Sequence, residues 1–283
     1  MKMRPLVSII VANYNYSRYF PRFFQALERQ TLGLCAVEIV FVDDGSTDGS
    51  LEKIAHWKRK LPACGFEVIK IRHTGKPGLV RNAGSKRAGA EYLLYLDPDD
   101  LVAPDFLAEC LTGLHDAGAD LAYTDWMCCG PGEPYVIVSP EYDPGLLATQ
   151  NFFPLPTLMR RKVWEKSTGF AENTAYEDWD FWVQAAHNGF SASRIPRPLY
   201  YHMVHGDNFS YQARQKDGPA KAMIVLNNKY FFDAAVVSWA KGLLRGEPWA
   251  VAFKRGLIPR ARDVSELRRI EARVLGGKKE PRP

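Results

Sequence analysis

The amino-acid sequence predicts an α/β fold: a mixed, mostly parallel sheet flanked by helices, followed by a C-terminal helical appendage. Over the first hundred residues, short apolar runs alternate with amphipathic stretches of helical spacing, as in successive βαβ units. Three of the runs, VSIIVA, VEIVFV and YLLYL, are continuously apolar, as in strands that are buried on both faces. The chain has 283 residues, of which 46% are hydrophobic, and can therefore bury a core of this kind.

The regular first part of the chain contains four predicted strands and three predicted helices. The strands are Leu6–Ala12, Val37–Val42, Phe66–Ile71 and Tyr92–Leu96. The helices between them lie near Tyr19–Gln30, Ser50–Lys60 and Gly78–Ala88. Connections of this kind are right-handed crossovers between parallel strands.

The pattern after Asp120 is less regular. The predicted elements are strands at Leu121–Asp125 and Tyr135–Val138, an extended run at Thr157–Arg160 that leads into a short helix, a helix at Glu177–Asn188 and an extended segment at Arg197–His205. Helical periodicity dominates from Ala220, and the polar end GGKKEPRP is expected to be disordered. We therefore expect a main α/β domain over residues 1–215 and a helical extension over residues 216–283.

The net charge of +5 is unevenly distributed. Residues 241–283 contain 12 Lys/Arg and 5 Asp/Glu, a net charge of +7, so residues 1–240 carry −2. A basic end of this kind is either solvated or attracted to anionic lipid. Peripheral membrane contact through this end is therefore an expectation, whereas nothing in the charge pattern predicts a nucleic-acid partner.

Cysteine usage and hydropathy bear on the cellular compartment. The five cysteines are odd in number and form no CxxC pair, which favours reduced thiols over disulfides or a zinc site. No apolar stretch approaches the roughly 20 residues that a membrane span requires. We expect a cytoplasmic protein, with the inner face of the membrane as its other candidate location.

Polar residues follow each of the first four predicted strands. Asn13, Tyr14 and Asn15 follow the first strand, and a pair of acids follows the second. The third runs into HTGK and the fourth into DPDD. Because ligands of such sheets bind beyond the carboxyl ends of the strands, the four clusters predict one site.

The run YLLYLDPDD carries the strongest single signal. Asp97 and Asp99 end an apolar strand one residue apart, where two carboxylates can hold a divalent cation that also binds a phosphate-bearing ligand. One alternative is a plain strand-to-helix turn, in which Asp105 serves as the helix cap. The other is a phosphatase of the DxDx(T/V) type, but Leu101 stands where that motif has Thr or Val.

Two further motifs supply nucleotide-binding groups. In VDDGSTD, Asp43 and Asp44 can accept hydrogen bonds from a base or a ribose, Gly45 permits a sharp turn, and Ser46 or Thr47 is expected to cap the next helix. The alternative for this motif is a capped turn with no ligand.

In HTGKPGLVRNAG, Lys76 and Arg81 lie near a helix start, which favours a diphosphate. Asn82 and Gly84 indicate tight packing against the neighbouring loops. Taken alone, this motif favours an ordinary basic helix face.

Together these motifs resemble the inverting family 2 glycosyltransferases of the GT-A fold. The shared order is VSIIVANYN, VDDGSTD, GKPGLVRNAG and LDPDD, continued by RRKVWEKSTGF, YEDWDFW and YYHMVHGDNFS. The resemblance covers about residues 5–210 and implies a nucleotide-diphosphate-sugar donor, with UDP favoured, and Mg²⁺ or Mn²⁺ as cofactor. It further implies a glycan or lipid-linked acceptor in bacterial surface polysaccharide synthesis.

The resemblance also implies a role for each matching residue. Asn13 and Tyr14 would line the nucleotide base. Asp43 or Asp44 would bond the base edge or the ribose, and Arg81 would lie close to the base or the diphosphate. Asp97 and Asp99 would form the DxD motif, with Asp99 as the direct metal ligand. His205 would add a metal or phosphate contact.

A catalytic base is expected in the Glu177-Asp178 pair. Single displacement at a sugar carbon needs one base to take the proton of the acceptor hydroxyl, and the resemblance places that base at Asp178, with Glu177 positioning the acceptor. In a second hypothesis the chain is a non-catalytic module that binds nucleotide-sugars. A third, a sugar nucleotidyltransferase, would require a GxGxRxxP loop that NYNYSRYFP lacks.

Overall fold

The computed structural model describes residues 4–206 and 216–276, and within them the chain divides into two compact units. Unit 1 contains residues 1–142, 152–172 and 188–206, and unit 2 contains residues 143–151, 173–187 and 207–283. Each unit is therefore assembled from separate stretches of the chain. The resemblance reaches Ser210, which lies outside the described residues, as does the tail from residue 277.

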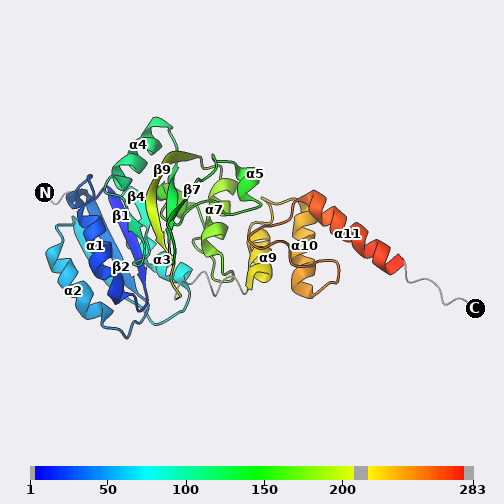
Figure 1. Ribbon diagram of the computed structural model, residues 1–283, viewed down its shortest axis with the longest axis horizontal. Helices are drawn as coiled ribbons and strands as arrows, with labels where there is room; N and C mark the ends of the chain where they lie inside the picture. The colour runs from blue at the N-terminus through cyan, green and yellow to red at the C-terminus, as the bar shows by residue number, and fades with distance from the viewer. Residues whose placement is uncertain (1–3, 207–215, 277–283) are drawn as a thin grey trace, which may run out of the picture. The chain divides into compact units, whose positions relative to one another are not determined.

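All strands belong to unit 1 and form a mixed sheet in the order β3-β2-β1-β4-β8-β6-β9-β5, with β7 paired to β6. Their bounds are β1 Val7–Asn13, β2 Val37–Asp43, β3 Gly65–Lys70, β4 Tyr92–Tyr95, β5 Leu101–Val102, β6 Leu121–Cys129, β7 Tyr135–Ile137, β8 Leu158–Arg160 and β9 Ala192–Met203. The first four strands are parallel to one another, whereas β8 is antiparallel to both β4 and β6. The predicted α/β architecture with a mostly parallel first half is confirmed (Figure 1).

Helices cover both faces of the parallel part of this sheet. They are α1 Phe20–Glu28, α2 Ser50–Lys60, α3 Pro77–Ser85, α4 Phe106–Asp116 and α6 Arg161–Glu165, with 3-10 turns η1 Ser17–Tyr19 and η2 Leu34–Ala36. The apolar side chains of α1, α2 and α4 share one buried cluster with alternate residues of β1 and β2. Helix α3 packs on the opposite face, where Ile10 of β1 contacts Gly84. The strand β5 and the helix α4 were not among the predicted elements.

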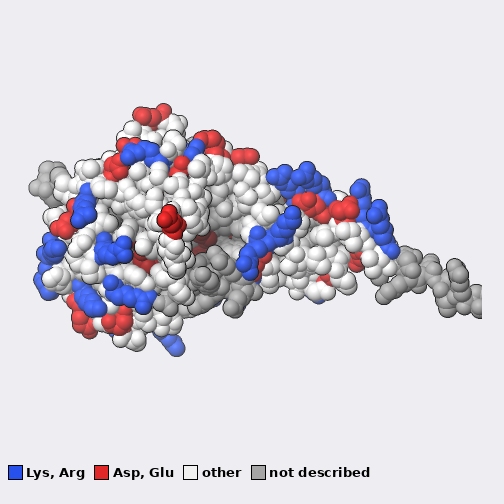
Figure 2. All heavy atoms as spheres, in the orientation of Figure 1, with Lys and Arg blue, Asp and Glu red and all other residues white. Residues whose placement is uncertain are grey.

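Unit 2 is helical. Its elements are α5 Pro144–Leu147, α7 Glu177–His187, α9 Asp217–Asn227, α10 Ala234–Arg245 and α11 Ala261–Gly276. Helix α9 packs on α10, and α10 contacts α11. Lys and Arg side chains gather over α11 (Figure 2). No helix among the described residues is both long enough and apolar enough to cross a membrane.

Candidate functional site

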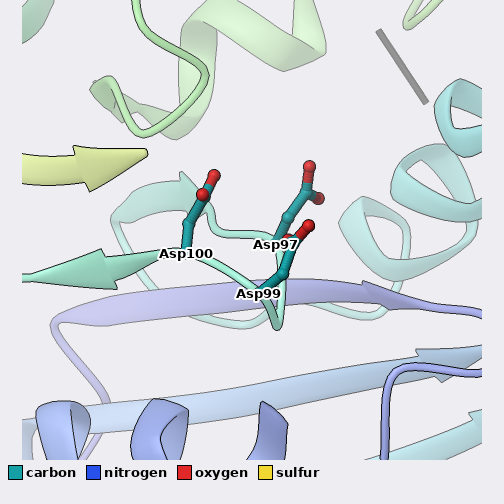
Figure 3. A group of neighbouring side chains, drawn as sticks. All are labelled: Asp97, Asp99 and Asp100. Carbon is teal, nitrogen blue, oxygen red and sulfur yellow. The ribbon is translucent and has the colours of Figure 1, made fainter. Parts of the chain in front are cut away.

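Three carboxylates gather in the loop that follows β4. Asp97, Asp99 and Asp100 each place an oxygen within 4.8 Å of the others, and Figure 3 shows the side chains leaving one short loop. The backbone N–H of Asp100 donates to the carbonyl of Asp97 at 3.1 Å and closes the turn around Pro98. Asp97 and Asp99 were singled out in the sequence, whereas Asp100 was missed although it belongs to the same DPDD run.

The electrostatics of this acid cluster favour a bound cation. Burial raises the pKa of Asp99 to about 9, with smaller contributions from the charges of Asp100 and Asp97. Burial also raises the pKa of Asp97, against the opposing effect of Arg81. Three neighbouring carboxylates cannot all ionise without compensation. Their oxygens are hard ligands of the kind that Mg²⁺ and Mn²⁺ prefer, so the donor set fits the expected cofactor.

Arg81 of α3 provides a fixed positive charge next to the acid cluster. Its Nη2 donates to both carboxylate oxygens of Asp97, at 3.0 and 3.1 Å, and its side chain is buried. The neighbouring Asn82 exchanges two hydrogen bonds of 2.9 Å with the backbone of Phe170. Asn82 thus packs against a loop, as predicted, whereas Gly84 packs against strand side chains instead.

His205 reaches the acid cluster from the chain beyond β9. Its Nε2 lies 2.9 Å from Oδ2 of Asp99, and its ring stacks on Tyr19 at 5.1 Å between centroids. Tyr16 lies against the same ring, at 6.2 Å. Burial, followed by the charge of Asp99, raises the pKa of Tyr16. The motif NYNYSRY contains both tyrosines, but in the sequence they carried no chemical signal beyond their aromatic character.

Asp100 ties the acid cluster to β9. Its carboxylate accepts hydrogen bonds from Tyr200 Oη at 2.5 Å and from the backbone N–H of Met203 at 2.9 Å. His202 Nδ1 lies 3.1 Å from the same carboxylate. Because β9 leads directly to His205, these contacts hold the chain that brings His205 to Asp99.

Asp43 is buried beneath the loop that follows β1. It accepts from Asn13 Nδ2 at 2.9 Å and from the backbone N–H of Ser46 at 3.0 Å, and it has no exposed surface. Ser46 Oγ accepts from Asn13 rather than capping α2. The predicted cap at Ser46 or Thr47 is wrong, because α2 begins at Ser50 and Asp48 accepts the Ser50 N–H.

Asp44 fixes the loop that follows β3. It accepts from the backbone N–H groups of Thr74 and Gly75, at 2.8 and 3.1 Å, and lies 3.1 Å from His73 Nδ1. The His73 ring stacks on Tyr14 at 4.0 Å between centroids, and Tyr14 is 42% exposed. The sequence pattern alone assigns no role to His73. The sequence could not pair it with Tyr14, because the two residues follow different strands.

The sheet order brings these groups to one edge of unit 1. Strands β2 and β4 flank β1, so the ends that carry Asp44 and Asp97 are separated by two strand spacings, roughly 10 Å. Gly45, with φ of 76°, makes the sharp turn that the sequence predicts after β2. The four polar clusters thus follow four adjacent parallel strands, as one site requires.

The Glu177-Asp178 pair lies in unit 2, at the start of α7. Asp178 Oδ2 accepts from Asn151 Nδ2 at 3.1 Å, and its Oδ1 accepts from the backbone N–H of Trp179 at 2.8 Å. Glu177 is buried. Two parts of the chain therefore orient the Asp178 carboxylate: helix α7 itself and the segment that follows α5.

Comparison with known sequences identifies the family. The model of "Glycosyl transferase family 2" matches residues 8–178. The putative glycosyltransferase EpsH of Bacillus subtilis is 28% identical over 222 residues, which are 71% of this chain and 61% of EpsH. Chondroitin synthase of Escherichia coli is 26% identical over 219 residues, which are 74% of this chain and 30% of that protein. The chain thus spans less than two thirds of the length of these relatives.

Solved structures share the fold. Staphylococcus aureus TarS in complex with UDP-GlcNAc superposes with a TM-score of 0.66 at 21% identity, covering 87% of this chain and 73% of the other. A mannosyltransferase from Pyrobaculum calidifontis in complex with GDP-Man and Mn²⁺ gives 0.60 at 17% identity, covering 98% and 89%. At these identities the likeness shows the GT-A fold alone. Together with the family match over residues 8–178, it shows that this chain belongs to glycosyl transferase family 2.

Proposed function

We propose that this chain is a metal-dependent, inverting glycosyltransferase of the hexosyltransferase type, which moves a sugar from a nucleotide-diphosphate-sugar to an acceptor hydroxyl. The observation that carries the proposal is the acid cluster of Asp97, Asp99 and Asp100 at the end of β4, with its oxygens within 4.8 Å of one another. A cation at such a site neutralises the charge that develops on the departing diphosphate. Asp99 and Asp97 would hold it, with His205 beside them.

The donor side of the proposal uses the loops after β1, β2 and β3. Tyr14 and Asn13 would line the base, and His73, stacked on Tyr14, would extend the same surface. Asp43 and Asp44 would fix these loops against the base and ribose, since both carboxylates hold loop N–H groups. UDP is the favoured nucleotide because a TarS structure of this fold contains UDP-GlcNAc. GDP is the alternative, since the mannosyltransferase structure contains GDP-Man.

The acceptor side of the proposal uses Asp178 as general base. Its carboxylate would take the proton of the acceptor hydroxyl while that oxygen bonds to the anomeric carbon and the bond from that carbon to the phosphate oxygen breaks. Attack from the face opposite the leaving group inverts the configuration. Glu177 would position the acceptor. The pair begins α7, where the helix dipole favours negative charge, and the Trp179 N–H orients the Asp178 carboxylate.

The acceptor is proposed to be a growing bacterial surface glycan or a lipid-linked one. Relatives that share parts of this sequence are named for such polymers, among them a poly(ribitol-phosphate) N-acetylglucosaminyltransferase and a chondroitin synthase. We further propose that residues 1–215 form the catalytic domain and that the protein works in the cytoplasm, at the inner face of the membrane, which its basic C-terminal extension would contact.

A thermal-shift screen of UDP, GDP and dTDP with and without Mn²⁺ tests the metal-dependent proposal. The wild type should be stabilised by one nucleoside diphosphate plus Mn²⁺, by about 2.7 kcal/mol at a hundredfold excess over Kd. Asp99→Ala should lose the stabilisation that depends on Mn²⁺ and keep the stabilisation by nucleotide alone. It removes a proposed metal ligand but leaves the residues proposed to bind the nucleotide base unchanged. Asp116→Ala, at an exposed acid on α4, is the control and should behave as wild type.

Two outcomes would count against the proposal. If Mn²⁺ adds nothing to the wild type, the chain does not use the metal as described. If nucleotide and Mn²⁺ bind but no sugar is hydrolysed or transferred with any donor that stabilises the protein, the non-catalytic binding module becomes the better interpretation. Retention of the full Mn²⁺ effect in Asp99→Ala would remove that residue from the metal site.

A further inference from the structure

Unit 1 contains a cavity at the amino-terminal edge of the sheet. Its volume is about 620 Å³, and it lies where the chain enters β1 and β4 and leaves β8. The acid cluster follows β4 at the strand's other end. The cavity is therefore separate from the candidate active site and takes no part in the proposed transfer reaction.

Cations dominate the lining of this cavity. Arg4, Arg160, Arg161 and Lys162 line it, against one acid, Glu91. Arg160 pairs with Glu91 at 3.2 Å, and Lys162 pairs at 2.6 Å with Asp120 outside the lining. Arg4 and Arg161 have no carboxylate partner within residues 4–206 and 216–276. The four cations of the lining, set against Glu91 and Asp120, leave a net charge of +2 around the cavity.

Arg161 is held in place by the backbone around it. Its Nε donates to the carbonyl of Ala90 at 2.7 Å and its Nη2 to that of Ala88 at 2.6 Å. Arg160 is held similarly, by the Ala119 carbonyl and Tyr92 Oη. The remaining terminal nitrogens, Nη1 of Arg161 and Nη2 of Arg160, have no partner among the described residues, and neither is a buried atom. Two oriented guanidinium groups that each keep an unused N–H donor can bind a planar or tetrahedral oxyanion.

We propose that this cavity binds a phosphate ester of a polyol or sugar. The charge excess of two suits an anionic phosphate ester, either a monoester dianion or a diester monoanion, and fixed arginines lose little conformational entropy on binding it. The volume exceeds what a bare phosphate needs, and Pro5, Leu6 and Ala90 supply an apolar wall against which the carbon skeleton of the ester would lie. The ester is either a free molecule or the headgroup of an anionic lipid.

Titration calorimetry with sn-glycerol 3-phosphate tests the proposal on the full chain. UDP and Mn²⁺ are kept saturating, so that the donor site is not available to the probe. Wild type should bind saturably, and glycerol should not bind. Arg4→Glu combined with Lys162→Glu should weaken binding at least tenfold, because it replaces two exposed cations by two anions. Lys58→Glu combined with Arg59→Glu changes the net charge equally on exposed positions of α2 and should bind as wild type.

Hydrogen exchange gives a second measurement that does not depend on a variant. Saturation with the ester should slow exchange in residues 88–92 and 158–162, which surround the cavity. Helix α11 exposes two apolar side chains, Ile270 and Val274, which could also bind vesicles. To separate the two sources, flotation with phosphatidylglycerol and with phosphatidylcholine vesicles is therefore repeated on the same variants in an Ile270→Asp, Val274→Asp background. Loss of phosphatidylglycerol binding in the cavity variant without binding of the free ester assigns the site to a lipid headgroup.

The proposal is overturned if neither the ester nor phosphatidylglycerol binds the wild type with the donor site filled. It is also overturned if the cavity variant and the α2 variant weaken binding to the same extent, because the effect is then one of net charge. Neither result bears on sugar transfer, which the nucleotide and Mn²⁺ screen tests separately.

Discussion

At the scale of single residues, Asp178 has the best-defined place in the proposed reaction. Its two oxygens accept hydrogen bonds from Asn151 and from the N–H of Trp179, so the carboxylate is oriented before an acceptor arrives. Asp178→Asn keeps the shape and removes the base. We expect transfer to fall at least ~10²-fold, the usual contribution of a general base, with donor affinity unchanged. Single-turnover transfer and calorimetric donor binding measure the two quantities.

Glu177→Gln is the matched comparison for this prediction. If Glu177 positions the acceptor, Glu177→Gln should raise the KM for acceptor more than it lowers kcat. Asp178→Asn should instead lower kcat more than it raises that KM. Full transfer activity in Asp178→Asn would exclude Asp178 as the base. A larger loss of kcat in the Glu177 variant would exchange the two roles.

Residue identities alone predicted two of the three acids that meet after β4, but not what each contacts. Asp97 and Asp99 follow from the apolar strand that ends before them, since strand and motif are contiguous in sequence. The contacts of Asp44 with the Thr74 and Gly75 amides, and of Asp100 with Tyr200, join segments 30 and 100 residues apart. Partners at such distances depend on strand order and loop conformation, which a local pattern does not encode.

At the scale of elements, the position of α3 depends on one glycine. A Cβ on Gly84 would lie 2.5 Å from Ile10 Cγ2 and 3.1 Å from Val42 Cγ2, and both neighbours are β-branched residues with restricted rotamers. Gly84→Ala should therefore lower the free energy of unfolding by about 1–3 kcal/mol, the usual cost of overpacking. Urea unfolding measures it. Gly65→Ala is the control, since its Cβ would meet Glu38 Cβ at an ordinary 3.4 Å.

The same variant has a functional consequence, because α3 also carries Arg81. If the helix moves away from the sheet, the Arg81–Asp97 contact is disturbed, so Gly84→Ala should also weaken Mn²⁺-dependent nucleotide binding. A variant as stable as wild type would show that Ile10 and Val42 adjust without cost, and the close packing would then have no energetic role.

Helix α7 contains a buried carboxylate that should make stability depend on pH. Asp180 has no exposed surface and accepts hydrogen bonds from the amides of Gln184, Asn227 and Asn228. Burial raises its pKa to about 6. The folded protein then holds this proton more tightly than the unfolded chain. The stabilisation is complete below the unfolded pKa near 4 and is lost as the pH rises through about 6.

Asp180→Asn isolates this effect, because it removes the titrating group at nearly constant volume. Between pH 5 and pH 8, the unfolding free energy of the wild type should fall relative to that of the variant by about 1.4 kcal/mol. Urea unfolding at both pH values measures the difference. With Asp116→Asn, at an exposed acid, the corresponding difference should be near zero. A difference for Asp180→Asn that does not change with pH would refute the raised pKa.

Most elements with a clear hydrophobic pattern were predicted close to their observed bounds, whereas the shortest elements were not. The four parallel strands were placed within one residue at each end, and α2 was placed at Ser50–Lys60. Helix α4 was not predicted, although its buried residues Phe106, Leu107, Cys110, Leu111 and Leu114 recur at helical spacing on one face, so the sequence does contain its signal. Strand β5 has two residues, too few for any period to be seen.

At the scale of the whole molecule, the chain passes repeatedly between its two units. Segments 143–151 and 173–187 belong with the C-terminal helices, while 152–172 and 188–206 belong with the sheet. Helical periodicity dominates only from Ala220, and the excess of positive charge lies in residues 241–283, so the sequence suggested a single boundary, near residue 216. Assignment of a segment to a unit depends on which partner buries its apolar side chains, and helices α5 and α7 give no sign of that choice in their own residues.

Helix α11 provides the prediction that concerns the protein's location. Its first turns pack through Val264, which is buried, whereas Ile270 and Val274 are 49% and 60% exposed on one face. Arg262, Arg269 and Arg273 are exposed on the same helix. Exposed apolar residues beside arginines are the features with which a helix binds an anionic membrane surface. The full chain should therefore float with phosphatidylglycerol vesicles at low salt and less with phosphatidylcholine.

Two variants decide whether this face of α11 is responsible. Ile270→Asp with Val274→Asp should reduce flotation about tenfold or more, since each partly exposed side chain contributes roughly 1 kcal/mol of burial in the membrane interface. Val136→Asp with Val138→Asp makes the same chemical change at positions on and beside β7 that are 47% and 66% exposed, and it should float as wild type. Equal loss in both variants would mean that added negative charge, rather than the α11 face, sets the affinity. If neither variant loses flotation, this face of α11 does not make the membrane contact.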